Sequence, residues 1–413
     1  MTQSTLAFLR QNATTLSAGA LLAFLSSFGQ TFFISIFAGE IRAAYGLSHG
    51  AWGGIYMLGT LASAAVMVWA GSLTDIFRAR ALGGMVLAAL AASCFAMALN
   101  PLAALLPLVI FALRLTGQGM CSHIAVVAMS RWFVATRGRA LAVATSGHAL
   151  GEALLPILFV SLLALYDWRM LWFGAGLVAL LGIWPLQRAL SRERTPQSMA
   201  HENPSLGMDG RHWTRAEMLR GRLFWFMIPA LLGPPAFGTA FFFHQVHYAE
   251  IKALSHLGLV ALFPVYTGSA ILSMIASGWA LDRVGTPRLL PLYQLPMVLA
   301  FAAFALGQGI PGAMLGLILF GMTSGANATL PNAFWAEFFG TRHLGSIKAM
   351  AAAVMVLGSA LGPGLTGALI DAGVGLETQY LGVAGYFLFS NLMMGLGVRA
   401  HAHRVDRPVS AAA

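Results

Sequence analysis

Long apolar runs separated by short polar stretches fill most of this chain. After a polar start that ends near Ser17, the runs of the first half cover residues up to about 39, then 50–71, 81–100, 103–128, 140–164 and 169–188. Those of the second half cover 223–247, 257–281, 288–308, 312–335, 345–370 and 379–398. Each run has roughly the 20 residues that an α-helix needs to cross the hydrocarbon core of a bilayer. The pattern predicts an all-α membrane protein with twelve transmembrane helices in two six-helix bundles.

The first apolar run could be a signal peptide or a transmembrane helix, and the middle of the chain differs from the apolar runs on either side. A cleaved signal peptide is a competing interpretation of the first run, but Arg10 is its only charged flank and the run is longer than a usual signal h-region, so we interpret it as helix one. The middle is polar and has little apolar periodicity, which predicts a linker with a short helix near Trp213–Arg220. The expected domains are an N-terminal bundle (1–187), a cytoplasmic linker (188–222) and a C-terminal bundle with a short tail (223–413).

One short charged loop occurs twice. Gly71-Ser72-Leu73-Thr74-Asp75, with Arg80 behind it, recurs as Gly278-Trp279-Ala280-Leu281-Asp282, followed by Arg283. The offset is 207 residues, about half of 413, and each copy lies between two apolar runs. The chain is therefore two copies of one unit, the internal repeat that is typical of secondary transporters.

The composition agrees with the apolar pattern, and the distribution of basic residues predicts the orientation of the chain in the membrane. With 58% hydrophobic and 9% charged residues, the chain is far from a soluble domain. The net charge of +10 does not indicate nucleic-acid binding, because the basic residues lie in loops between the apolar runs. Of the 24 Lys and Arg residues, twenty fall on the side of both termini, three on the other side, and Arg114 lies within a run. The positive-inside rule then predicts a multi-pass inner (plasma) membrane protein with both termini and the linker in the cytoplasm.

Two six-helix halves with a glycine-to-aspartate loop after the second helix of each resemble the major facilitator superfamily. The first loop matches the family pattern at Gly71, Leu73, Asp75 and Arg80, and the second at Gly278, Asp282, Arg283 and Gly285. Ile76 and Arg78 depart from the pattern in the first copy, as do Thr286 and Pro287 in the second. The resemblance implies that these loops gate the cytoplasmic side, with Asp75 placed against a neighbouring helix N-terminus and a loop arginine. A solvated turn charge is the alternative role for Asp75 and Asp282.

Ionisable side chains at membrane depth are costly and are therefore candidates for function. Arg114 lies near the middle of the fourth run, in a sequence that partly resembles the arginine-glycine signature of the family. Glu152 lies at a similar depth in the fifth run, so the two residues are plausible partners, either for function or as a self-neutralising structural pair. His148, four residues before Glu152, shares its helical face and is a second candidate for carrying a proton.

Uncharged polar residues complete the expected substrate site. The candidates are Arg114 with Gln30, Tyr56, Gln118, Tyr266 and Asn327, and each of the uncharged ones could instead be a hydrogen-bonded packing residue. The seventh run contains Gly233-Pro234-Pro235, which predicts a break in that helix.

Together these features predict a secondary transporter for a small organic solute. A buried cation favours a carboxylate, with Glu152 carrying a coupled proton, and the motif set most resembles that of monocarboxylate or organic-anion carriers, which implies a symporter. Proton-driven efflux of an amphipathic drug or metabolite is the alternative within transport, and a membrane sensor on the same fold is the alternative outside it. No nucleotide-binding motif and no nucleophile–base pair is evident, so we expect neither an ATPase nor an enzyme. We expect a monomer in the lipid bilayer, with no cofactor, metal or nucleic-acid partner.

Overall fold

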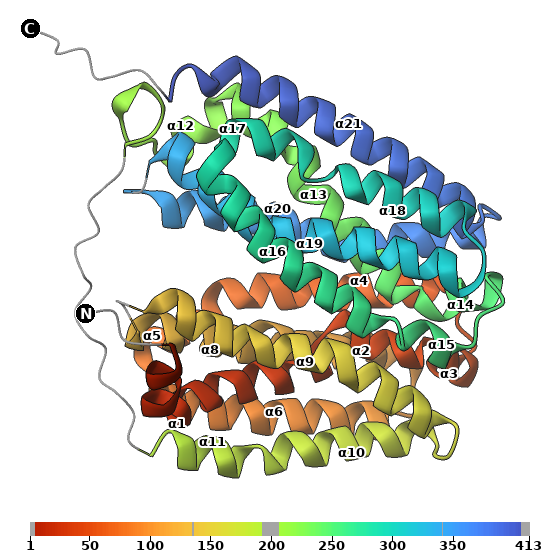
Figure 1. The fold of residues 1–413 in the computed structure, drawn as a ribbon. Helices are drawn as coiled ribbons and strands as arrows, with labels where there is room; N and C mark the ends of the chain where they lie inside the picture. Colours follow the sequence, from red (N-terminus) through yellow and green to blue (C-terminus); the bar gives the residue numbers. More distant parts are fainter. Residues whose placement is uncertain (1–4, 134–135, 192–205, 341, 406–413) are drawn as a thin grey trace, which may run out of the picture. The chain divides into compact units, whose positions relative to one another are not determined.

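The computed structural model describes residues 5–133, 136–191, 206–340 and 342–405, and these ranges contain helices and no strand (Figure 1). Eleven of their helices are long and apolar enough to cross a membrane. A further pair, Ala7–Gly29 and Thr31–Tyr45, is bent by 47° and gives a twelfth span when it is counted as one. The prediction of an all-α protein with twelve transmembrane helices is confirmed.

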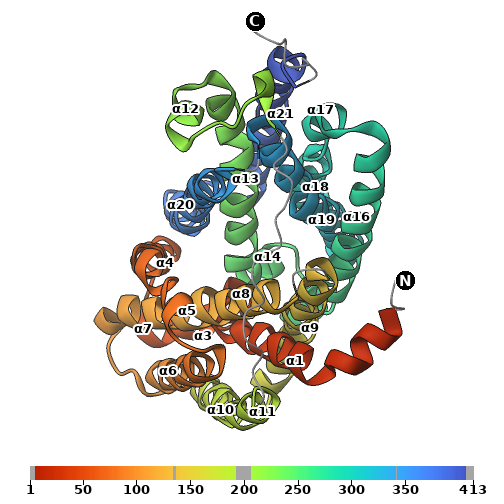
Figure 2. The ribbon, with the colours of Figure 1, turned by 90° about the vertical axis from the view of Figure 1, so that its left-hand side faces the viewer.

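Contacts along the chain divide it into two units. Unit one comprises Met1–His201 together with the short segment Phe242–Val246. Its helices are α1 (Thr5–Leu25), η1 (Ser26–Gly29), α2 (Thr31–Ile34), η2 (Ser35–Phe37), α3 (Ala38–Tyr45), α4 (His49–Ala70), α5 (Leu73–Ile76), α6 (Ala79–Leu99), η3 (Ala103–Leu105), α7 (Leu106–Leu113), η4 (Arg114–Cys121), α8 (Ser122–Trp132), α9 (Arg137–Leu163), α10 (Trp168–Leu181) and α11 (Ile183–Ala189). Within this unit, α1 packs against α9 and α6 packs against α10 (Figures 1 and 2).

Unit two comprises Glu202–Phe241 and His247–Ala413. Its helices are η5 (Met208–Gly210), α12 (Arg215–Arg220), α13 (Arg222–Phe243), α14 (Gln245–Ile251), α15 (His256–Val260), α16 (Phe263–Val284), α17 (Thr286–Leu289), η6 (Leu290–Leu292), α18 (Leu295–Leu306), α19 (Gly309–Phe339), α20 (Leu344–Asp371) and α21 (Leu376–Ala402). The last residues of α13 and the first of α14 belong to unit one by their contacts. Within unit two, α19 packs against both α16 and α18, and α18 also packs against α21.

Some helices begin or end at a cap that the local sequence provides. The Ser48 side chain accepts a hydrogen bond from the Ala51 N–H at the start of α4, and Asp167 accepts one from the Arg169 N–H at the start of α10. Gly46 ends α3 with a φ of 63°, a left-handed conformation that suits glycine.

Large apolar side chains cover the outer surface of the helices. Val68, Trp69, Leu99 and Leu181 are each more than 70% exposed. In water such a surface would be costly, whereas lipid tails satisfy it, and the helices satisfy their own backbone groups. The exposed apolar surface therefore agrees with a multi-pass membrane protein.

The expected break at Gly233–Pro235 is wrong, because α13 continues through these residues as far as Phe243. Proline has no N–H, so Pro234 cannot bond the Ala230 carbonyl one turn earlier. The buried Gln294 side chain takes that place, with its Nε2 donating to the Ala230 oxygen at 2.7 Å. A neighbouring side chain thus satisfies the freed backbone group, and the helix is not interrupted there.

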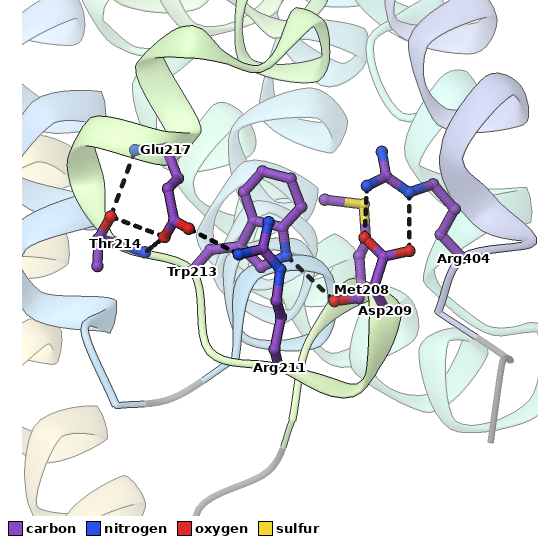
Figure 3. A network of polar contacts seen from close by, with 7 residues as sticks. All are labelled: Met208, Asp209, Arg211, Trp213, Thr214, Glu217 and Arg404. Carbon is purple, nitrogen blue, oxygen red and sulfur yellow. Dashed lines mark hydrogen bonds and ion pairs between the residues drawn. The ribbon is translucent and has the colours of Figure 1, made fainter. Parts of the chain in front are cut away.

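The second part of the polar middle stretch is folded against unit two, and α12 confirms the short helix expected near Trp213–Arg220. The Thr214 hydroxyl accepts from the Glu217 N–H at 3.3 Å while Glu217 Oε2 accepts from the Thr214 N–H at 2.8 Å, which is a capping box (Figure 3). Asp209 forms an ion pair with Arg404, which follows α21, and the Trp213 N–H donates to the Phe339 carbonyl at 2.9 Å. Residues 206–221 are thus tied to the ends of α19 and α21, and we call them the linker cap.

Candidate functional site

The first helix of unit one is interrupted at Gly29 and Gln30. Gln30 has extended backbone angles (φ −85°, ψ 153°), between η1 and α2. Opposite this break, the fourth span winds as a π-helix over Arg114–Cys121. A Cβ on Gly29 would lie 2.8 Å from the Gly117 Cα, and a Cβ on Gly117 would lie 2.6 Å from the Gly29 Cα. Only glycine at both positions allows the two backbones to approach this closely.

Arg114 is directed at this break. Its side chain is buried (2% exposed), and its Nη1 donates to the Gly29 carbonyl at 3.2 Å and to the Thr31 hydroxyl at 3.3 Å. A helix that stops leaves carbonyls without partners within the helix, so the break supplies the acceptor. Arg114 Nε is also buried and has no hydrogen-bond partner among the described residues. The guanidinium therefore retains an unused donor at membrane depth.

Tyr56 of α4 completes the surroundings of Arg114. The Arg114 guanidinium carbon lies 5.3 Å from the centre of the Tyr56 ring, within range of a cation–π interaction. The Tyr56 hydroxyl lies 2.5 Å from the Thr31 hydroxyl. Gln30 immediately precedes Thr31 in the sequence, and Gln118 lies four residues after Arg114. Both side chains are half-buried and make no hydrogen bond to other described residues.

The structure gives Arg114 partners other than Glu152. The described hydrogen bonds of Arg114 go to Gly29 and Thr31, because the side chain reaches the open end of η1. Glu152 and His148 lie on α9, and both are half-buried. The His148 ring packs edge-on against Phe32 of α2, with 5.7 Å between ring centres. The interrupted first helix therefore has Arg114 on one side and His148 on another.

The candidates of unit two form hydrogen-bonded groups of their own. The Tyr266 hydroxyl donates to the Ser324 hydroxyl at 3.2 Å. The Tyr293 hydroxyl donates to Asn327 Oδ1 at 3.2 Å, and Gln294 Nε2 donates to the Tyr293 hydroxyl at 2.8 Å. Tyr266 and Asn327 thus take part in separate networks that both involve α19.

The structure describes some of the residues in the two repeated loops. The Gly71 carbonyl lies 3.2 Å from His123 Nε2 on α8, and Arg80 Nε donates to Gln187 Oε1 on α11 at 2.8 Å. In the second copy, Gly278 lies in α16, and the exposed Arg283 packs 4.1 Å from the centre of the Trp279 ring. The side chains of Asp75 and Asp282 lie outside the described part of the structure.

The chemistry available in unit one is binding rather than bond cleavage. Arg114 offers a buried positive charge with a free donor, and Gln30 and Gln118 offer amides. Within the described residues, no group of three His, Cys, Asp or Glu side chains could hold a metal ion.

Comparison with known families decides the class. A family model described as Major Facilitator Superfamily matches residues 19–363 and 265–411. The chain belongs to the Major Facilitator Superfamily. As a member of this family it is a transporter of small solutes rather than an enzyme.

Known members of the superfamily are similar in sequence or fold. Monocarboxylate transporter 13 of Bos taurus is 30% identical over 269 residues, which cover 63% of this chain and 60% of that protein, less than two thirds of its length. A bacterial homologue of the human lysosomal transporter Spinster, in an inward-facing and unoccupied conformation, has a TM-score of 0.73 at 14% identity and covers 96% of this chain and 99% of its own. The nucleoside transporter NupG has a TM-score of 0.69 at 15% identity and covers 95% of this chain and 99% of its own. At these identities the solved structures show a shared fold.

The sequence predicted Arg114 and Tyr56 as site residues but did not predict their partners. Arg114 bonds the Gly29 carbonyl and the Thr31 hydroxyl, and Tyr56 contacts the same hydroxyl. A signal was present, because Gly29-Gln30-Thr31 places a glycine and two polar residues in the middle of an apolar run. Small and polar residues in a membrane span are typical of an interrupted helix in a transporter.

Proposed function

We propose that this transporter carries a small organic carboxylate together with a proton. The observation that supports this most is Arg114, a buried guanidinium whose Nε has no partner among the described residues. Leaving a buried donor of a charged group unbonded is costly, so the arrangement favours a ligand that accepts from it. A carboxylate matches the planar fork of arginine and supplies the missing negative charge.

The position of Arg114 also supports a transport site. It lies at an interrupted helix near the middle of a span, where transporters of several folds hold their substrates. Tyr56 places an aromatic ring beside the guanidinium, and Gln30 and Gln118 have amides free to bind polar groups of a solute. The sequence relative is named as a monocarboxylate transporter, which agrees with this substrate class.

We assign the coupled proton to Glu152, with His148 as a second carrier one turn away. Both lie on α9, which packs against the interrupted helix that Arg114 contacts, and His148 itself meets Phe32 of that helix. A carboxylate that arrives at Arg114 adds a negative charge to unit one, and this charge favours protonation of Glu152. The proton and the acid then cross together, because the neutral combination is less costly in the low-dielectric interior of the membrane.

For orientation, we propose an inner (plasma) membrane protein, active as a monomer, with both termini and the linker in the cytoplasm. The support is the distribution of Lys and Arg, twenty of 24 on that side. The loops at Gly71–Arg80 and Gly278–Arg283 then lie on the cytoplasmic side, where we expect Asp75 and Asp282 to hold one gate position as the two bundles alternate.

Purified protein in liposomes tests this function. Uptake of labelled acetate, lactate, pyruvate, succinate and benzoate should be measured with and without an imposed pH gradient, in parallel with extrusion of a cationic dye. We expect at least one acid to accumulate when the outside is acidic. Dye extrusion without acid uptake would contradict the proposal and favour the efflux alternative.

A variant separates proton coupling from binding. Glu152→Gln keeps the shape of the side chain but cannot release a proton, so it should exchange labelled for unlabelled acid yet fail to accumulate acid against a gradient. Glu250→Gln on α14 is the control, because it makes the same chemical change at an exposed carboxylate that pairs with His247. Normal accumulation by Glu152→Gln would exclude Glu152 as the coupling residue.

A further inference from the structure

The segment Phe242–Val246 joins α13 to α14 and packs within unit one. At its centre, Gln245 is fully buried. Its Nε2 donates to the Phe32 carbonyl at 3.2 Å and to the Ser35 hydroxyl at 2.7 Å. A glutamine buried in a membrane protein with its amide bonded to another helix is an anchor, because leaving these groups unpaired is costly.

Aromatic contacts hold the same segment. The Phe243 ring stacks on Trp52 with 5.5 Å between ring centres and an angle of 22°. It also lies 4.6 Å from the ring of Tyr56, measured between centres. Tyr56 in turn contacts Thr31 and Arg114, so the segment is one ring away from the proposed substrate site.

The short helix α2 (Thr31–Ile34) has hydrogen bonds from other segments at both of its ends. On its N-terminal side, Arg114 donates to Gly29 and Thr31. On its C-terminal side, Gln245 donates to the Phe32 carbonyl and to Ser35. This turn is α2, four residues long, and it lies between the 3₁₀ turns η1 and η2. Short 3₁₀ pieces within a span often mark a hinge, so α2 can move as a unit.

We propose that Gln245 is a positioning residue in the transport cycle, and that α2 transmits the occupancy of Arg114 to the segment 242–246. This inference rests on the proposed carboxylate site. A carboxylate forms charge-assisted bonds, which are stronger than the neutral bonds that Arg114 makes to Gly29 and Thr31. Binding therefore draws Arg114 away from the N-terminal side of α2. The turn then rotates on its two 3₁₀ ends, the bonds to Gln245 weaken, and the segment is released.

The role of Gln245 is tested first without any acid. A cysteine in place of Val246 reports on the segment through its rate of reaction with a membrane-impermeant maleimide, and the parent chain sets the background because Cys94 and Cys121 are buried. Gln245→Ala should raise this rate roughly tenfold, the effect of losing two neutral hydrogen bonds of about 0.7 kcal/mol each at about 1.4 kcal/mol per decade.

Gln379→Ala is the matched control, because Gln379 Nε2 also donates two hydrogen bonds, to the Thr366 and Val374 carbonyls, but lies in unit two. It should leave the labelling rate unchanged. An equal rate in Gln245→Ala and the parent, or an equal rise in both variants, would overturn the role of Gln245 whatever the substrate is.

The coupling to Arg114 is tested with each of the five acids of the uptake panel. In Val246→Cys without a second substitution, which is the parent for this comparison, an acid that binds should raise the labelling rate at residue 246. Thr31→Val keeps the shape of the side chain but removes the hydroxyl that Arg114 and Tyr56 contact. At acid concentrations above the Kd measured for this variant, its labelling rate should therefore no longer depend on acid. An acid-dependent rate in Thr31→Val equal to the parent, or binding to the parent without any change in rate, would contradict the coupling. If no acid binds, the proposed function fails, while the comparison without acid still decides the role of Gln245.

Discussion

Replacing Gly117 by alanine tests the close approach of the two interrupted helices on which the candidate site depends. The added Cβ would lie 2.6 Å from the Gly29 Cα, 2.7 Å from the Gly29 nitrogen and 3.1 Å from the Ser26 carbonyl oxygen. All three neighbours are backbone atoms, which cannot turn aside as a side chain can. The π-helix and η1 must therefore separate, and Arg114 must move away from its acceptors.

The cost follows from overpacking. Inserting a methyl group into a packed interior typically destabilises by about 1 to 3 kcal/mol, and we expect the upper part of this range because both walls are backbone. The helix propensity of alanine is more favourable than that of glycine by about 1 kcal/mol, which offsets part of this loss of stability. The net expectation is a loss of about 1 to 2 kcal/mol, together with a large loss of acid uptake.

Gly174→Ala is the matched control, because Gly174 lies in α10 and a Cβ there meets nothing within 4 Å. Thermal unfolding of both variants in detergent should be compared with the parent, alongside uptake in liposomes. Gly174→Ala should unfold at or slightly above the temperature of the parent. If Gly117→Ala is as stable and as active as Gly174→Ala, the two backbones do not meet as described.

Two further predictions concern ionic contacts outside the candidate site. Lys252 is 1% exposed, and its Nζ donates to Glu377 Oε1 at 2.6 Å and to the Ala305 carbonyl at 2.7 Å. Glu377→Ala leaves the buried cation with only the Ala305 carbonyl, so it should cost about 1 to 3 kcal/mol of stability in detergent, more than Lys252→Met. In the linker cap, hydrogen bonds from Thr214 and Arg211 lower the pKa of Glu217 from 4.5 to about 2. A depressed carboxyl pKa contributes stability above the unfolded value, and this contribution is lost as the pH falls toward 2. The protection factors of the α12 amides, which correct for the intrinsic dependence of exchange on pH, should therefore stay constant above pH 4.5 and fall below it, and Glu217→Gln should remove this fall.

The sequence predicted the number of spans well because each is a largely apolar run of sufficient length, and the thickness of the bilayer sets that length however the helices pack. The short helix near Trp213–Arg220 was also predicted, and the structure shows that α12 is stabilised locally, by the capping box of Thr214 and Glu217. These features depend on residues that are close in the chain. Charge counting and the repeated loops are also local, and they were enough to indicate a transporter.

The details of the candidate site depend on contacts between distant segments, and sequence could not supply them. The first helix breaks at Gln30 without a proline, because Gly29 must meet Gly117 of another span. Conversely, α13 continues through Pro234, because Gln294 bonds the freed carbonyl of Ala230. Similar depth suggested Glu152 as the partner of Arg114, but depth says nothing of the direction in which a side chain points.

The most direct test of the central claim measures the affinity of Arg114→Lys for the transported acid. Lysine keeps the charge but loses the planar fork, and one charge-assisted bond contributes about 1.5 to 3 kcal/mol, so Kd should rise at least about tenfold. Arg169→Lys is the control, because Arg169 also makes two hydrogen bonds through Nη1, to the Ala98 and Asn100 carbonyls, and packs on a tyrosine ring, but at the end of the helices. We predict a raised Kd and KM for Arg114→Lys alone. An unchanged Kd in Arg114→Lys, with the protein folded, would show that the carboxylate is not held by Arg114.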